Sequence, residues 1–145
     1  MKNLIILGAT GSIGRQTLEV LDNLINEYQL ISIAFGRNLE IGKEIIKKYN
    51  PEYVSVEYEK DAHYLKEQFP NIKFGYGLEG LITASTYEAN NNYETVVVTA
   101  VVGSVGLIPT VEAIKKGYHI ALANKETLVT AGSIIMDLIK KYPLT

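Results

Sequence analysis

The sequence contains no cysteine and no tryptophan, and only two histidines among its 145 residues. Without cysteine it can form neither a disulfide framework nor a zinc–thiolate site, and it has no thiol nucleophile. No apolar run approaches the roughly 18 residues needed to cross a membrane, and the run Leu4–Leu7 is too short for the core of a signal peptide. We therefore expect a cytoplasmic protein with no membrane partner.

Excess charge of either sign is also absent, because 14 basic and 16 acidic residues leave a formal net charge of −2. A nucleic-acid-binding domain is usually basic, so we expect no nucleic-acid partner. Apolar residues make up 47% of the chain and charged residues only 21%, which argues against intrinsic disorder. Length and composition together predict one globular domain with its own core.

Short apolar segments alternate with amphipathic segments along the whole chain. The apolar segments are rich in isoleucine, valine and leucine, as in strands that are buried on both faces of a parallel sheet. Such alternation of strands and helices predicts an α/β fold with a doubly wound, mostly parallel sheet. The expected strands are Asn3–Gly8, Leu30–Gly36, Tyr53–Val56, Ile72–Phe74, Thr95–Val101 and His119–Ala123.

The segments between these strands carry apolar residues at helical spacing, so each is expected to form a helix with one apolar face. A shorter helix is expected around Leu78–Thr86, before an exposed loop at Asn90–Asn92, and a last helix from Asn124 to about Lys141. The four expected apolar stripes are Gly14, Leu18, Leu21 and Ile25; Ile41, Ile45 and Tyr49; Tyr58, Ala62, Leu65 and Phe69; and Leu107, Val111, Ile114 and Tyr118.

A glycine-rich turn, Gly-Ala-Thr-Gly-Ser-Ile-Gly, occupies residues 8–14 between the first expected strand and helix. Gly8 would end the strand in a conformation that other residues avoid, Gly11 would let the backbone approach a pyrophosphate, and Gly14 would let the helix pack closely on the sheet. Ser12 would cap the helix, whose N-terminal N–H groups would face the anion. The turn predicts a Rossmann-like dinucleotide-binding domain; the alternative is a turn kept for packing alone.

The second expected strand ends in Phe35-Gly36-Arg37-Asn38. NAD-binding domains usually have an aspartate or glutamate here for the ribose 2′-hydroxyl, whereas the nearest downstream acid in this chain is Glu40. An arginine can instead pair with a 2′-phosphate through charge-assisted hydrogen bonds. This segment predicts NADP rather than NAD, the alternative being that Arg37 is a solvated loop residue.

Two later segments also place distinctive residues at strand ends. Ala100–Gly106 is a second glycine-rich turn, which forms either a wall of the ligand crevice near the nicotinamide or a plain tight turn. Asn124, Lys125 and Glu126 begin the last expected helix directly after a strand. Lysine is unfavourable in a first helical turn because of the helix dipole, so Lys125 either serves an anionic substrate or is an ordinary surface lysine.

These motifs together resemble those of the 1-deoxy-D-xylulose 5-phosphate reductoisomerase family, over Met1 to about Lys141. The similar segments are Gly8–Gly14, Gly36–Asn38, Ala100–Gly106, Leu107–Thr110 and Ala121–Gly132, of which the last is the most specific. The resemblance implies an oxidoreductase that uses NADPH and a divalent metal, magnesium or manganese. Such an enzyme rearranges and reduces 1-deoxy-D-xylulose 5-phosphate to 2-C-methyl-D-erythritol 4-phosphate in the non-mevalonate pathway of isoprene biosynthesis.

The resemblance also implies roles for single residues. Some family members have lysine in place of Arg37, and either cation suits a 2′-phosphate. The implied phosphate-binding residues are Thr10, Gly11, Ser12 and Ile13; those at the adenosine end are Gly36, Arg37 and Asn38; Asn124 and Glu126 would also contact NADPH, and Lys125 would contact the phosphosugar substrate.

A further implication concerns the extent of the chain. In the family, an acidic motif that supplies the metal ligands follows the last helix, whereas this sequence has only three aspartates, Asp22, Asp61 and Asp137, and no acidic cluster. We therefore expect residues 1–145 to form the NADPH-binding domain, with no metal site and no catalytic residue. The catalytic metal-binding and C-terminal domains would be missing, the fragment alone inactive, and the full-length protein a homodimer.

Two other functions fit part of the sequence. A short-chain dehydrogenase or epimerase has a similar glycine turn, but it commonly needs a Tyr-x-x-x-Lys pair, and none of the ten tyrosines has lysine four residues later. A non-catalytic dinucleotide-sensing module would need only the first glycine turn. It would give no reason for Asn124, Lys125 and Glu126 at the end of a strand that faces the same crevice.

Overall fold

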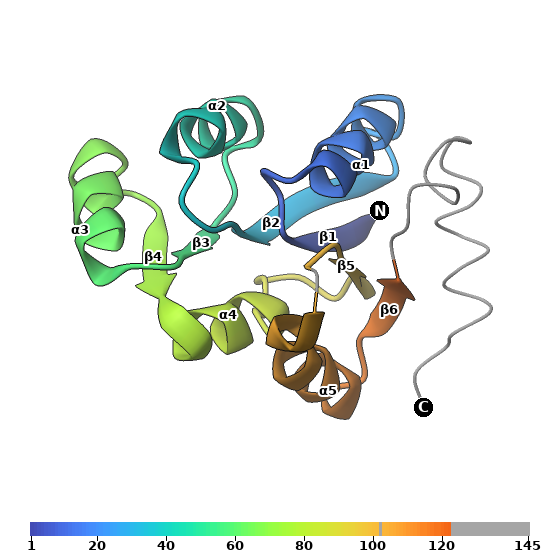
Figure 1. Ribbon diagram of the computed structural model, residues 1–145. Helices are drawn as coiled ribbons and strands as arrows, with labels where there is room; N and C mark the ends of the chain where they lie inside the picture. The colour runs from blue at the N-terminus through green and yellow to red at the C-terminus, as the bar shows by residue number, and fades with distance from the viewer. Residues whose placement is uncertain (102, 123–145) are drawn as a thin grey trace.

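A six-stranded parallel sheet is the centre of the fold (Figure 1), in a computed structural model that describes residues 1–101 and 103–122. The order of the strands is β4-β3-β2-β1-β5-β6, so the chain winds outward from β1 in both directions, and every neighbouring pair is parallel. This confirms the doubly wound α/β fold. The strands are β1 Lys2–Leu7, β2 Tyr28–Ala34, β3 Tyr53–Val56, β4 Lys73–Tyr76, β5 Thr95–Thr99 and β6 His119–Leu122.

Helices cover both faces of the sheet. Figure 1 shows α1, α2 and α3 on one face and α4 and α5 on the other, with the short 3₁₀ helix η1 leading into α5. The bounds are α1 Ser12–Asp22, α2 Leu39–Tyr49, α3 Glu59–Gln68, α4 Gly77–Ser85, η1 Gly103–Gly106 and α5 Leu107–Lys115. The expected last helix, from Asn124 to about Lys141, lies outside the described residues.

The core has two layers because side chains alternate across each strand. In β1, Leu4 and Ile6 pack with the cluster under α1, α2 and α3, whereas Ile5 and Leu7 pack with the cluster that includes Ala84 of α4. All four side chains are at most 1% exposed. Burial on both faces explains why the strands have continuous apolar runs instead of an alternating pattern.

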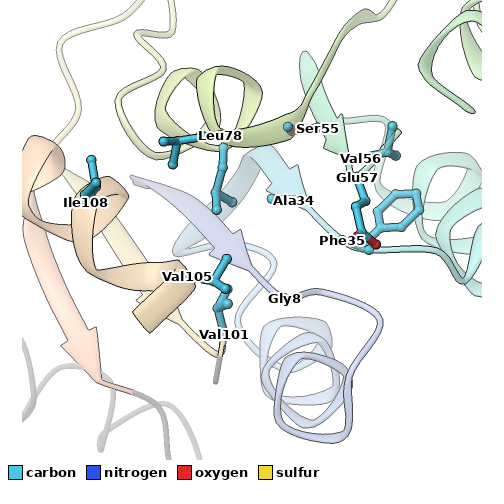
Figure 2. A pocket seen from close by; sticks show the side chains of 13 residues that line it. Gly8, Ala34, Phe35, Ser55, Val56, Glu57, Leu78, Val101, Val105 and Ile108 are labelled. Carbon is cyan, nitrogen blue, oxygen red and sulfur yellow. The ribbon is translucent and has the colours of Figure 1, made fainter. Parts of the chain in front are cut away.

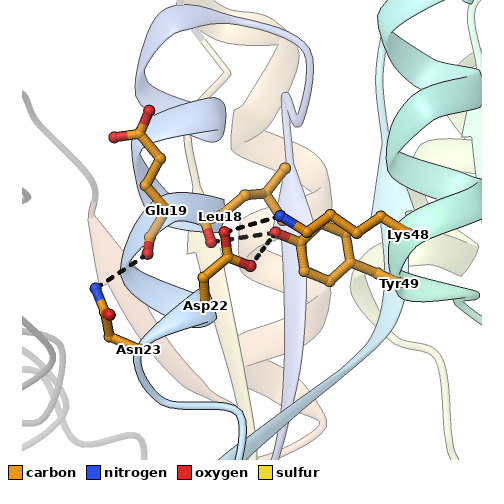
Figure 3. A network of polar contacts seen from close by, with 6 residues as sticks. All are labelled: Leu18, Glu19, Asp22, Asn23, Lys48 and Tyr49. Carbon is orange, nitrogen blue, oxygen red and sulfur yellow. Dashed lines mark hydrogen bonds and ion pairs between the residues drawn. The ribbon is translucent and has the colours of Figure 1, made fainter.

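A polar network joins the end of α1 to the end of α2 (Figure 3). The Asp22 carboxylate accepts hydrogen bonds from Lys48 Nζ at 2.9 Å and from the Tyr49 hydroxyl at 2.5 Å. Burial alone would raise the pKa of Asp22, but these two hydrogen bonds outweigh it, so the pKa lies below its ordinary value. Burial and the Asp22 carboxylate raise the pKa of Tyr49 to about 12.

Three of the expected helical faces are wrong in part. Tyr58, expected on the apolar face of the third helix, is the N-cap of α3 and is exposed. Helix α1 ends at Asp22, before Ile25, and Ile25 is exposed because the chain turns there toward β2. In α5 the expected stripe of Leu107, Val111 and Ile114 faces outward, and the residues buried in this helix are Pro109 and Ala113. Small residues let the helix lie closer to its neighbours, and the apolar spacing could not reveal this choice.

The loop before β5 is also less exposed than expected. Asn91 is half-buried and exchanges two amide hydrogen bonds with the buried Asn3, of 2.9 and 3.1 Å. The rest of the expectation holds, since Asn90 and Asn92 are exposed. In residues 1–101 and 103–122, no helix is both long and apolar enough to span a membrane.

Candidate functional site

The site lies where the strand order reverses, between the carboxyl ends of β1 and β5. In an open α/β sheet, ligands bind in the crevice at such a point. The turn after β1 is fixed there by three backbone hydrogen bonds. The N–H groups of Gly8 and Ala9 donate to Ala34 O at 2.8 and 2.9 Å, and Ala100 N–H donates to Leu7 O at 2.8 Å.

The three glycines of this turn have different structural roles. Gly8 has a φ of +90°, and a Cβ there would lie 2.8 Å from Ala100 O, so both conformation and space require glycine. A Cβ on Gly14 would lie only 2.1 Å from Gly8 O, which confirms the close helix packing expected of this residue. A Cβ on Gly11 would make only an ordinary contact, 3.6 Å from Gly8 O.

Helix α1 begins differently from the expectation. Gly11, in an extended conformation, is the N-cap, and Ser12 is already the first helical residue, so the expected cap by Ser12 is wrong. Because glycine has no side chain, this N-cap offers no side-chain acceptor to the N–H groups of the first turn. The N–H groups of this turn, near Ser12 and Ile13, can therefore bind an anion at the positive end of the helix.

A cavity of about 570 Å³ opens beside the glycine turn (Figure 2). This volume is in the range of small-molecule and cofactor sites. Strand ends form one side of it, and α4 with the segment after β5 forms the other. Its lining residues are Gly8, Ala34, Phe35, Gly36, Ser55, Val56, Glu57, Gly77, Leu78, Leu81, Val101, Val105 and Ile108.

The cavity lining distinguishes the two roles expected of the second glycine-rich turn, a wall of the crevice or a plain tight turn. Val101 and Val105, on either side of its first glycine, both line the cavity, so this segment forms a wall of the crevice. Val105 and Ile108 are also exposed, and they give the mouth of the cavity an apolar surface that suits a flat ring. Figure 2 places Val101, Val105 and Ile108 across the cavity from Phe35 and Glu57.

Arg37 lies at the rim, just after β2, and it has a partner that the sequence analysis missed. Its Nε donates to Glu57 Oε2 at 2.9 Å, and its guanidinium carbon lies 5.7 Å from the centre of the Tyr58 ring. Both charged side chains are substantially exposed, at 72% and 45%. No motif identifies Glu57, which is 20 residues away in sequence; its only signal is its place directly after β3.

Asn38 has a structural role that the sequence analysis did not predict. Its side-chain oxygen accepts a hydrogen bond from Ile41 N–H at 3.2 Å, and this bond caps the N-terminus of α2. The cap fixes the start of α2 next to Arg37. It also leaves the amide N–H groups of Asn38 available as donors to a ligand.

The structure thus brings together two of the three expected groups of binding residues. Residues 10–13 follow the lining residue Gly8 and lead into α1, and Arg37 and Asn38 follow Gly36 just after β2; of the expected residues in these two groups, Gly36 lines the cavity itself. The third group, Asn124, Lys125 and Glu126, lies outside the described residues. In the part of the chain that the structure describes, no group of three or more His, Asp or Glu side chains could hold a metal ion.

Comparison with known proteins agrees with this geometry. The family model of 1-deoxy-D-xylulose 5-phosphate reductoisomerase matches residues 4–132. The chain belongs to this family. The reductoisomerase of Listeria monocytogenes serotype 4b is 48% identical over 141 residues, and that of Bacillus subtilis is 48% identical over 144 residues. The short-chain dehydrogenase alternative is thereby excluded.

Solved reductoisomerases share the fold. The Zymomonas mobilis enzyme in complex with NADPH has a TM-score of 0.73 and 31% sequence identity over 97% of this chain. A reductoisomerase in complex with NADPH, fosmidomycin and magnesium has a TM-score of 0.77 and 31% identity over 98% of it. The sequence alignments with the Listeria and Bacillus relatives cover 97% and 98% of this chain, but only 36% and 37% of those relatives. The chain therefore spans about a third of the length of its relatives.

Proposed function

We propose that this chain is the NADPH-binding part of an enzyme that rearranges and reduces 1-deoxy-D-xylulose 5-phosphate to 2-C-methyl-D-erythritol 4-phosphate. The observation that carries the proposal is the cavity at the switch point of a reductoisomerase-family sheet, which is lined by Gly8, shortly before the N-terminus of α1, and by Gly36, directly before Arg37. The family's Zymomonas mobilis enzyme, with NADPH bound, supports the same choice of cofactor.

The phosphates of NADPH fit the start of α1. Two glycines, Gly11 and Gly36, have room for a Cβ against the protein, with nearest contacts of 3.6 and 4.0 Å. Packing within the described residues therefore does not require glycine at either position. A ligand that approaches the protein backbone closely would require it. We assign Thr10, Gly11, Ser12 and Ile13 to the pyrophosphate, which the N–H groups of the first helical turn would bind.

The adenosine end fits the region around Gly36, Arg37 and Asn38. Arg37 would bind the 2′-phosphate, and charge-assisted hydrogen bonds of this kind contribute about 1.5–3 kcal/mol. That corresponds to about a ten- to hundredfold preference for NADPH over NADH. Across the cavity, the apolar wall at Val105 and Ile108 would contact the flat nicotinamide ring.

NADPH supplies the hydride for the reduction. The residues of this chain bind and orient the cofactor, with Asn124 and Glu126 contacting it and Lys125 contacting the phosphosugar. Magnesium and manganese prefer carboxylate and other oxygen ligands, and we propose that residues of the enzyme outside the third of its relatives' length that this chain spans hold the metal. We propose that the complete enzyme is a homodimer.

Cofactor titration tests the proposal. The chain should bind NADPH with a dissociation constant about ten- to hundredfold lower than that for NADH, as measured by quenching or enhancement of nicotinamide fluorescence. Arg37→Ala should remove most of this preference while leaving NADH affinity nearly unchanged. If the variant keeps the NADPH/NADH ratio of the original chain, Arg37 does not bind the 2′-phosphate. If the original chain binds neither cofactor, the proposed function is wrong.

A further inference from the structure

The carboxylate of Glu57 lies beside Gly36, just past the end of β2. In those domains an aspartate or glutamate at the end of the second strand binds the ribose 2′-hydroxyl. Here the equivalent strand, β2, has no acid at its end, but a Cβ on Gly36 would lie 4.0 Å from Glu57 Oε2. The segment after the neighbouring strand β3 therefore brings a carboxylate beside the end of β2.

The parallel register of β2 and β3 explains this placement. Ala34 pairs with Ser55, so residues two positions further along, Gly36 and Glu57, lie side by side just past the ends of the two strands. The hydrogen bond from Phe35 N–H to Ser55 O, at 3.0 Å, continues the pairing toward that point. Glu57 also lines the cavity itself, so its carboxylate is accessible to a ligand there.

We propose that Glu57 is a specificity-determining residue that opposes Arg37 and sets the ratio of NADPH to NADH affinity; this rests on the proposed function. Glu57 accepts a hydrogen bond from the 2′-hydroxyl of NADH and repels the 2′-phosphate of NADPH. Arg37 attracts the same phosphate. The pair therefore gives a smaller preference for NADPH than an arginine alone would give.

The geometry of the ion pair allows Arg37 to keep its role. The hydrogen bond from Arg37 to Glu57 uses Nε of the guanidinium, so the terminal amino groups can donate to a phosphate. The Tyr58 ring, 5.7 Å from the guanidinium carbon, also helps to hold the group at the rim. A phosphate bound to those amino groups lies within a few ångströms of the Glu57 carboxylate, where like charges repel.

The test compares Glu57→Gln with the original chain in titrations with NADPH and NADH. We expect the variant to bind NADPH about fivefold more tightly, because a negative charge beside the phosphate is removed. We expect it to bind NADH about threefold more weakly, because a neutral amide is a poorer acceptor for the 2′-hydroxyl. The NADPH/NADH affinity ratio should therefore rise about fifteenfold, the product of these two changes.

Ionic strength separates repulsion from a structural effect. The gain in NADPH affinity should shrink as salt is raised from about 0.02 to 0.5 M, because exposed charges are screened over that range, whereas a change of fold would not follow salt in this way. Glu88→Gln is the matched control, because it changes the net charge by the same amount. Glu88 lies in the loop before β5, is exposed, does not line the cavity, and forms an ion pair with Lys116. This variant should leave the ratio unchanged.

The outcomes are distinguishable. If the original chain binds NADPH but Glu57→Gln leaves the ratio unchanged, or shifts it toward NADH, the role of Glu57 is wrong and the proposed function stands. An equal shift in Glu88→Gln also overturns it, because the effect is then one of overall charge. If the original chain binds neither cofactor, the proposed function fails, and this inference fails with it.

Discussion

The contrast between Gly14 and Gly11 gives the sharpest test of how the glycine turn works. A methyl group added at Gly14 would lie 2.1 Å from Gly8 O and 2.8 Å from Ala9 Cα, both backbone atoms. Those atoms cannot move aside easily, because Gly8 N–H and Ala9 N–H are hydrogen-bonded to Ala34 O. In Gly14→Ala, helix α1 must therefore move away from the turn by about 1 Å to restore normal contacts.

The expected loss of stability follows from two opposing terms. Overpacking that displaces backbone costs about 3 kcal/mol, at the upper end of its usual range. Alanine in a helix contributes about 1 kcal/mol more than glycine. The net loss for Gly14→Ala is then about 2 kcal/mol, which for a chain of this length lowers the melting temperature by about 6–7 °C.

Gly11→Ala is the matched comparison in the same turn. Its methyl group would be 3.6 Å from the nearest atom, and no left-handed φ is required there, so the melting temperature should change by about 2 °C or less. Because that methyl group would stand where the pyrophosphate approaches, NADPH affinity should fall about tenfold. Circular dichroism melts without ligand and fluorescence titrations well below both melting points give the two quantities. Equal melting temperatures for the two variants, or undiminished NADPH binding by Gly11→Ala, would refute this division of roles.

Three further outcomes are expected. Because the pKa of Asp22 is lowered in the folded state, its stabilising effect is present above the ordinary carboxyl range and lost as pH falls through the lowered pKa; the difference in urea stability between the original chain and Asp22→Asn should therefore shrink below about pH 4. Tyr49, with its pKa raised to about 12, stabilises below its ordinary pKa and loses the effect as pH rises from about 10 to 12, so Tyr49→Phe should flatten the alkaline limb of the stability profile. Residues 1–145 alone, given 1-deoxy-D-xylulose 5-phosphate and manganese, should bind NADPH without oxidising it in an absorbance assay; metal-dependent oxidation would mean that the metal site lies within this chain.

Local sequence was sufficient to locate the sheet and its glycine turn. All six strands were expected, and Tyr53–Val56 has the expected bounds, because strands buried on both faces need continuous apolar runs. Gly8 and Gly14 have the predicted roles because a strand that turns directly into a packed helix leaves no room for side chains there. These features depend on residues close together in the chain.

Tertiary structure decided what depends on residues far apart in the chain. Spacing predicted that Leu107, Val111 and Ile114 would face the sheet, but the close fit of α5 buries Pro109 and Ala113 instead. An apolar helix offers more than one face for burial, and the shape of its neighbours decides between them.

The cofactor rim shows the same limit. The sequence placed Arg37 at the end of a strand and indicated no acid near it, because that strand and the residues that directly follow it contain none. The register of β2 against β3 places Glu57 beside Gly36 and its carboxylate 2.9 Å from Arg37 Nε. Twenty residues separate this pair in the chain, and only the pairing of two strands brings the charges together.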